Sequence, residues 1–200
     1  LGKVLAATAA RGWADDIDVV FTTDHGEFQG DHGFLFKGPY HVDSLMRLPL
    51  VWRPAPSAGT VPSVVADPVG LVDLAPTFCQ IAGLRVPDWM DGEPLPTSPA
   101  VAAAQGRQRV LTEWDSVHSG GAEVHLQTLT RDGMVCTRYE PGTCHDGTEG
   151  ELWDLAEDPF QRVNLWDDPS RRPLRDDLLA DLDDHLPARP GERLAVQSPV

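Results

Sequence analysis

Two hydrophobic patterns follow each other along the chain and predict two architectures. In the first hundred residues, short apolar strands alternate with helical segments, as in an α/β sheet. β-branched and aromatic residues over Ile17–Thr23 predict a buried strand, and Leu48–Trp52 predicts a second strand that ends before Pro54. Helices are predicted over residues 1–12, which are rich in Ala and Leu, and over 69–84, where apolar residues recur every three or four positions.

Beyond a Pro-, Gly- and Ala-rich connection at 85–108, short strands separated by turns replace this pattern. The strands are predicted at Val110–Trp114, Val124–Thr130, Gly133–Tyr139 and Glu151–Leu155. Arg131-Asp132-Gly133 is a tight-turn signal, and Pro173–Leu186 predicts an amphipathic helix with leucines on one side and acidic residues facing water. We therefore expect two domains: residues 1–107, part of an α/β sheet, and 108–200, an antiparallel α+β subdomain closed by the last helix.

Composition narrows the class of protein. A hydrophobic content of 41% is compatible with a packed core, and no apolar run reaches the roughly 18 residues of a membrane helix. A net charge of −15 argues against nucleic acid as a partner, since phosphate binding requires clustered Lys and Arg. The three Cys do not predict a complete disulfide framework, although Cys136 and Cys144 could pair across a hairpin instead of remaining free thiols.

The two ends of the chain carry little further information. Residues 1–12 hold few charges and no initiator Met, so we expect them to be a helix cut from a longer chain. The compartment is therefore left open: a bacterial cytoplasm is favoured, and export cannot be judged. The tail after Pro187 is expected to be poorly ordered.

The run from Val19 to Lys37 carries the chemistry. Asp24 and His25 directly follow the first predicted strand, and ligands of open α/β sheets bind beyond the carboxyl ends of strands. A carboxylate suits Ca²⁺ or Mg²⁺, while an imidazole suits Zn²⁺ or Mn²⁺. Lys37 comes after the apolar run Phe34–Phe36 and offers a compact positive charge. These residues predict a site for a metal ion and a negatively charged group of a substrate.

Four stretches, in order, resemble the C-terminal portion of the sulfatases, within the alkaline-phosphatase-like superfamily. They are Asp24-His25-Gly26 with Gly30-Asp31-His32-Gly33 and Lys37-Gly38, Arg47–Trp52, Val72–Thr77 with Ala82-Gly83, and Gly150–Leu155 with Asp158-Pro159 and Asn164-Leu165. The matches extend over residues 17–186. The resemblance implies an α/β fold of the alkaline-phosphatase type and hydrolysis of a small-molecule sulfate ester by a metal-dependent enzyme. Aryl, choline and sugar sulfates remain open as substrates, and an oligomer is possible.

The resemblance also implies roles for single residues. Asp24 and His25 would bind one divalent metal ion, Ca²⁺ in most sulfatases, although a His at the second position leaves Mn²⁺, Mg²⁺ and Zn²⁺ open. Lys37 would be the catalytic and substrate-binding cation that holds the sulfate and the leaving oxygen. His32 would line the substrate entrance or bond within its own loop. The alternative without chemistry is a helix-capping Asp, a surface His and a surface Lys.

Other polar residues are expected to have structural roles. Asp73 is predicted to form hydrogen bonds near the start of the main helical segment of 69–84. Arg47 is predicted to form a buried ion pair, and His41 is a weaker candidate for the rim of the pocket.

Two features of sulfatases are missing from these 200 residues. There is no Cys-x-Pro/Ala-x-Arg motif, from which the formylglycine nucleophile is made, and there is no pair of Asp ligands from a first strand. The resemblance places both in the N-terminal half of a longer chain, so we expect the isolated chain to be inactive. Phosphonate and phosphate ester hydrolases of the same superfamily share the Asp-His and the Lys and are one alternative. A non-catalytic truncated module is another.

Overall fold

The computed structural model, which describes residues 1–118 and 120–186, divides the chain into two compact units. The first unit contains Leu1–Asp24 and Leu48–Arg107, and the second contains His25–Arg47 and the chain from Gln108 onward. The tail after Pro187, predicted to be poorly ordered, lies outside the described residues. Among the residues described, no helix is both long and apolar enough to cross a membrane.

Short helices and two short strands make up the first unit. They are α1 (Gly2–Ala10), β1 (Val19–Phe21), β2 (Val51–Arg53), η2 (Pro56–Ala58), η3 (Leu71–Asp73), α3 (Leu74–Ile81) and α4 (Pro99–Gln105). β1 and β2 pair antiparallel, with Val20 opposite Trp52. The expectation of a buried first strand is wrong, because Phe21 is 49% exposed and β1 has only three residues. A two-stranded ribbon has too few neighbours to cover both of its faces.

Asp73 fixes the start of α3, as predicted. Its Oδ2 accepts from the Gly70 N–H at 2.9 Å and from Arg107 Nη1 at 2.7 Å, and both charged side chains are almost fully buried. Thr77 extends the contact by donating to the Asp73 carbonyl at 2.6 Å and accepting from the Leu95 N–H at 2.8 Å. These bonds join the start of α3 to the segment that leads into α4.

α4 lies within the stretch that the sequence pattern assigned to a connection. Ser98 caps its first turn by accepting from the Val101 N–H at 3.3 Å, and Pro99 occupies the first helical position. Gly106 ends the helix with a φ of 68°, which is the left-handed conformation that glycine favours. The start and stop signals were therefore present in the sequence.

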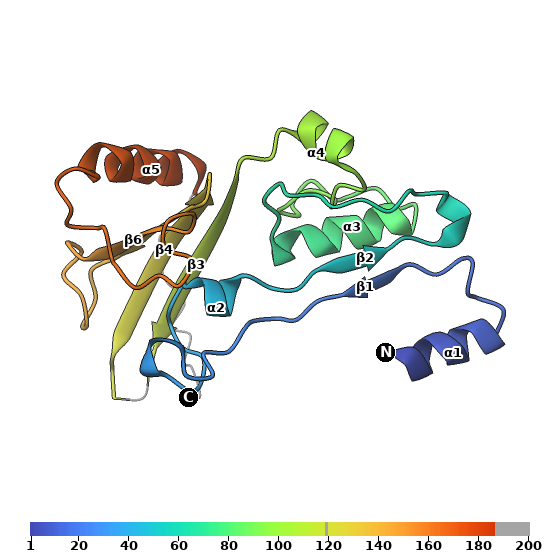
Figure 1. The fold of residues 1–200 in the computed structure, drawn as a ribbon, viewed down its shortest axis with the longest axis horizontal. Helices are drawn as coiled ribbons and strands as arrows, with labels where there is room; N and C mark the ends of the chain where they lie inside the picture. The colour runs from blue at the N-terminus through green and yellow to red at the C-terminus, as the bar shows by residue number, and fades with distance from the viewer. Residues whose placement is uncertain (119, 187–200) are drawn as a thin grey trace. The chain divides into compact units, whose positions relative to one another are not determined.

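A four-stranded antiparallel sheet and a long helix form most of the second unit, as predicted (Figure 1). Its elements are η1 (Asp31–Gly33), α2 (Asp43–Met46), β3 (Arg109–Val117), β4 (Glu123–Arg131), β5 (Met134–Tyr139), β6 (Gly150–Asp154) and α5 (Arg172–His185). The sheet order is β3-β4-β5-β6. Asp132 and Gly133 both have positive φ, 53° and 77°, which is the conformation that a two-residue hairpin turn requires.

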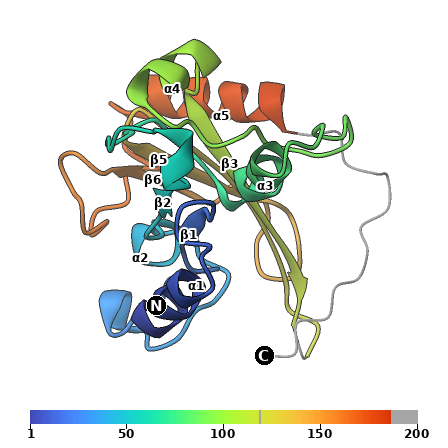
Figure 2. The ribbon, with the colours of Figure 1, turned by 90° about the vertical axis from the view of Figure 1, so that its right-hand side faces the viewer.

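α5 packs across one face of this sheet, as two perpendicular views show (Figures 1 and 2). The core between them consists of Leu129, Met134, Cys136, Leu152, Trp166, Leu178 and Leu182, all buried. Burying one such leucine contributes roughly 1.5–3 kcal/mol, so the helix is held mainly by apolar contacts. Cys136 and Cys144 are both free thiols, so the alternative of a disulfide between them is excluded. Burial raises the pKa of the Cys136 thiol to about 12.

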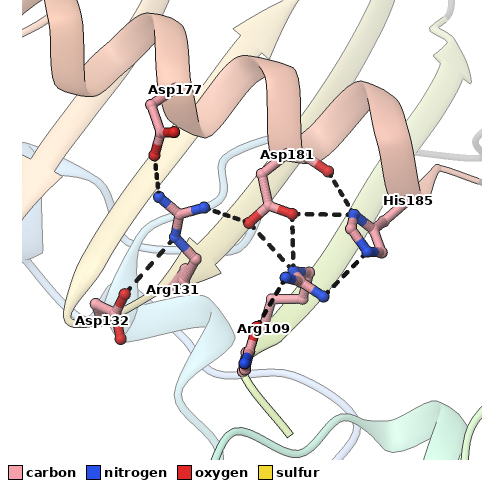
Figure 3. Close-up of polar contacts among 7 residues, drawn as sticks. Arg109, Arg131, Asp132, Asp177, Asp181 and His185 are labelled. Atoms are coloured by element: carbon pink, nitrogen blue, oxygen red, sulfur yellow. Dashed lines mark hydrogen bonds and ion pairs between the residues drawn. The ribbon is translucent and has the colours of Figure 1, made fainter.

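An ion-pair cluster joins α5 to the strands beneath it (Figure 3). Asp181 accepts from Arg109 Nε at 2.9 Å and also from Arg131, which bonds Asp177 as well. His185 Nε2 lies 3.1 Å from Arg109 Nη1, and its Nδ1 lies 2.9 Å from Asp181 Oδ1. The prediction that the acidic residues of this helix face water is therefore wrong for Asp181, whose side chain is 8% exposed.

Candidate functional site

His25 and Lys37, two of the predicted site residues, are in direct contact within the second unit. Lys37 Nζ lies 2.9 Å from His25 Nε2, and His25 Nδ1 lies 2.8 Å from the Gly26 carbonyl oxygen. A carbonyl oxygen can only accept and an ammonium can only donate. The proton of the neutral imidazole is therefore on Nδ1, and the lone pair on Nε2 accepts from Lys37.

Gly26 fixes the backbone that carries this imidazole. Its N–H donates to the Leu45 carbonyl at 2.9 Å, which joins the residue after His25 to α2. A Cβ at Gly26 would lie 1.9 Å from the Ser44 carbonyl oxygen, a distance that no side chain tolerates. Only glycine allows the two segments to approach so closely, and His25 is positioned as a result.

An aromatic cluster supports the loop between His25 and Lys37. Phe28 is 3% exposed and packs against Phe34 and Tyr40, with ring centroids 5.3 Å and 5.6 Å away. Phe34 also stacks on Tyr40 at 5.2 Å. Phe36, next to Lys37, is 75% exposed. The loop therefore has its own small core, from which the segment that carries Lys37 extends.

Asp24 and His25 have the donor chemistry of a divalent metal site. Asp24 immediately precedes His25 in the chain, at the end of the first unit, and accepts from Thr23 Oγ1 at 3.3 Å. A histidine that donates its other ring N–H to a carbonyl, as His25 does, is the usual state of a metal ligand. In the described part of the chain, no three His, Cys, Asp or Glu side chains converge on one metal position. The two residue types are donors that divalent ions use, and by themselves they do not complete a site.

His32 lies in the wall of a cavity of about 560 Å³ within the second unit. The wall is formed by Gly30, Asp31, His32, Asp43, Ser44, Arg47, Pro159, Phe160, Gln161 and Arg162. His32 has a φ of 51°, a conformation uncommon for a residue with a side chain, and its ring meets Phe28 edge-on at 6.0 Å. The cavity residues 159–162 were not predicted, because this stretch entered the sequence analysis only through Asp158-Pro159, as part of the family resemblance.

Arg47 and His41 differ from their expected positions. The Arg47 side chain is 79% exposed and pairs with Asp43 one helical turn away at 3.5 Å, so the predicted buried ion pair is wrong. His41 is buried rather than on a rim, and its Nδ1 lies 2.7 Å from Thr128 Oγ1. Burial lowers the His41 pKa to about 4, which keeps the ring neutral.

Comparison with protein families and with curated proteins gives consistent matches. Residues 30–187 match the family described as "N-sulphoglucosamine sulphohydrolase, C-terminal". The chain is 29% identical over 172 residues to arylsulfatase K of Xenopus laevis, covering 82% of this chain and 31% of that protein. It is 36% identical over 179 residues to the multifunctional alkaline phosphatase superfamily protein PehA of Trinickia caryophylli, covering 85% and 34%. The chain thus spans about a third of the length of these curated relatives.

Solved structures share the fold. The structure of BT4656 in complex with its substrate D-glucosamine-2-N,6-O-disulfate superposes with a TM-score of 0.74 at 22% identity, covering 92% of this chain and 36% of that one. The phosphonate monoester hydrolase of Agrobacterium radiobacter superposes with a TM-score of 0.73 at 27% identity, covering 92% and 38%.

Proposed function

Because the chain belongs to the sulfatase family and corresponds to its C-terminal portion, we propose that it is part of an enzyme that hydrolyses sulfate esters with a bound divalent metal ion. The observation that carries this proposal is the contact between Lys37 Nζ and His25 Nε2 at 2.9 Å. The contact brings a positively charged hydrogen-bond donor next to a candidate metal ligand. The proposed reaction uses both groups to bind the sulfate.

In this proposal Asp24 and His25 hold the metal ion, for which Ca²⁺ is the first candidate and Mn²⁺, Mg²⁺ and Zn²⁺ are the others. The bound ion would supply Lewis-acid stabilisation of the sulfate oxygens. Lys37 donates its N–H groups to the sulfate and to the oxygen on which charge develops as the ester bond breaks. The main chain at Gly26 keeps the His25 ring in place.

His32 is proposed to contact the remainder of the substrate. Its position in the wall of the 560 Å³ cavity, on the same loop as Lys37, supports this role. The nucleophile, expected to be a formylglycine, would come from outside these 200 residues, because the chain contains no Cys-x-Pro/Ala-x-Arg motif. We therefore expect no sulfate ester turnover by the 200 residues alone.

Replacement of Lys37 tests the proposal in the enzyme that carries this chain. Lys37→Ala should lower kcat/KM for an aryl sulfate by about 10²–10³, the usual effect of removing one donor to a developing oxyanion. Lys3, the only other lysine, is the matched control, and Lys3→Ala should leave kcat/KM unchanged. Equal activity of the two variants would contradict the assigned role of Lys37.

Hydrolysis of phosphonate esters is the second candidate function. Its support is the 27% identity to the phosphonate monoester hydrolase of Agrobacterium radiobacter. A metal ligand beside a lysine serves a phosphonate as well as a sulfate, so the residues present do not separate the two. Paired aryl sulfate and aryl phosphonate esters with the same leaving group would decide, and a clear preference for the phosphonate would overturn the sulfatase proposal.

A further inference from the structure

The His25 imidazole has one nitrogen that can bind a metal ion, and Lys37 occupies it. Nδ1 is committed as a donor to the Gly26 carbonyl oxygen at 2.8 Å. Nε2 therefore carries the only lone pair in the ring plane, and that lone pair accepts from Lys37 Nζ at 2.9 Å. One lone pair cannot accept a hydrogen bond and bind a cation at the same time.

We propose that Lys37 and the metal ion compete for the Nε2 lone pair of His25, so that metal binding releases Lys37 toward the substrate anion. This inference rests on the proposed function for the identity of the anion. In the metal-free protein, the ammonium hydrogen bond holds the His25 ring in its binding orientation. Once Nε2 binds the metal, Lys37 loses its acceptor and its N–H groups are available to an oxyanion.

The position of Lys37 makes such an exchange possible without unfolding of the loop. The Lys37 side chain is exposed, and its neighbour Phe36 is 75% exposed, so the long flexible stem can move into solvent. The backbone after His25 is held by the bond from Gly26 to Leu45 and by the close contact with Ser44, and the ring is held by its Nδ1 bond to the Gly26 carbonyl oxygen. The imidazole thus has a bond that metal binding does not break, whereas the exposed lysine does not depend on the loop to move.

Metal titration distinguishes competition from mere proximity. The protein that carries this sequence is titrated with Mn²⁺, and electron paramagnetic resonance measures the Mn²⁺ that remains free in solution. Lys37→Met should raise the Mn²⁺ association constant about tenfold or more, while Lys3→Met should leave it unchanged. Equal Mn²⁺ affinities of the Lys37→Met and Lys3→Met proteins would overturn the proposal.

The imidazole nitrogens give a readout that does not involve a metal. In the metal-free protein, the ¹⁵N chemical shift of His25 Nε2 should change on Lys37→Met, because an accepted hydrogen bond is lost, whereas that of Nδ1 should remain. An unchanged Nε2 shift would overturn the proposal. Both measurements are independent of turnover, so failure to hydrolyse sulfate esters would reject the proposed function and leave the competition standing.

Discussion

Replacement of one carboxylate tests the ion-pair cluster that joins α5 to the sheet. Asp181→Asn keeps the size of the side chain and removes its charge, leaving Arg109 and Arg131 without their shared partner. Removing one member of a buried ion pair costs about 3–5 kcal/mol. Here the arginine side chains remain 25% and 19% exposed, so water can partly solvate them after the substitution. We therefore expect a loss of about 2–3 kcal/mol in the free energy of unfolding.

The assay is denaturant unfolding at pH 7, with a neighbouring carboxylate as the control. Asp176 lies on the same helix and pairs with Arg175 at 3.0 Å, but its side chain is 57% exposed. Exposed pairs contribute about 0–1 kcal/mol, so Asp176→Asn should lose at most that amount. A loss on Asp181→Asn no larger than that of the control would refute the view that this cluster anchors the helix.

The pH dependence of the loss supplies a second check. Burial alone would raise the pKa of Asp181, but hydrogen bonds from Arg131 and Arg109 outweigh it, so the pKa lies below its ordinary value. A carboxylate with a lowered pKa in the folded state stabilises fully above the unfolded value of about 3.9 and stops doing so as pH falls through the folded value. The difference between wild type and Asp181→Asn should thus be constant from pH 7 to pH 5 and shrink below about pH 4. A difference that stayed constant at lower pH would contradict the charge-based explanation.

Three further outcomes follow from single residues. Gly26→Ala should lower Mn²⁺ affinity at least tenfold, as measured by titration, because its Cβ would lie 1.9 Å from the Ser44 carbonyl oxygen and the backbone at His25 must move. His41 has a folded pKa of about 4, so stability should be full above pH 6.5 and fall by about 3 kcal/mol as pH drops to 4; urea unfolding of His41→Leu should lack this slope. A thiol reagent should modify the exposed Cys144 while the buried Cys136 remains unreactive until the protein unfolds.

The sheet and the long helix of the second unit could be predicted well because one cause dominates their sequence pattern, whereas the inclusion of His25–Arg47 in that unit was not expected. A sheet covered on one face by a helix imposes alternation on its strands, and all four strands and α5 were found within a few residues of their true ends. The first unit was predicted less well. Its strands have three residues each, so their periodicity is too short to define their ends, and α4 was missed although Ser98, Pro99 and Gly106 mark its limits.

The polar side of α5 shows what a helical pattern does not reveal. Its leucines identify the buried side, but Asp181 lies three residues after Leu178 and therefore on nearly the same face. Whether that carboxylate faces solvent depends on what lies opposite. Arg109 and Arg131 come from strands about 70 and 50 residues earlier, and only the folded register places them beneath the helix. Whether a charged side chain on a helix is buried thus depends on the residues opposite it as much as on its position in the helix.

For the candidate site too, the sequence shows some features and only the folded structure shows the others. The identity of Asp24, His25 and Lys37 as candidates came from residue types and their order. The contact between His25 and Lys37 could not be predicted in this way, because the two residues are twelve positions apart. They are joined by a loop whose fold depends on the packing of its aromatic side chains. The tautomer of His25 depends on a carbonyl one residue away, which no sequence pattern encodes. Since this tautomer leaves a single lone pair on Nε2, the proposed competition between Lys37 and a metal ion rests on a hydrogen bond that only the structure could reveal.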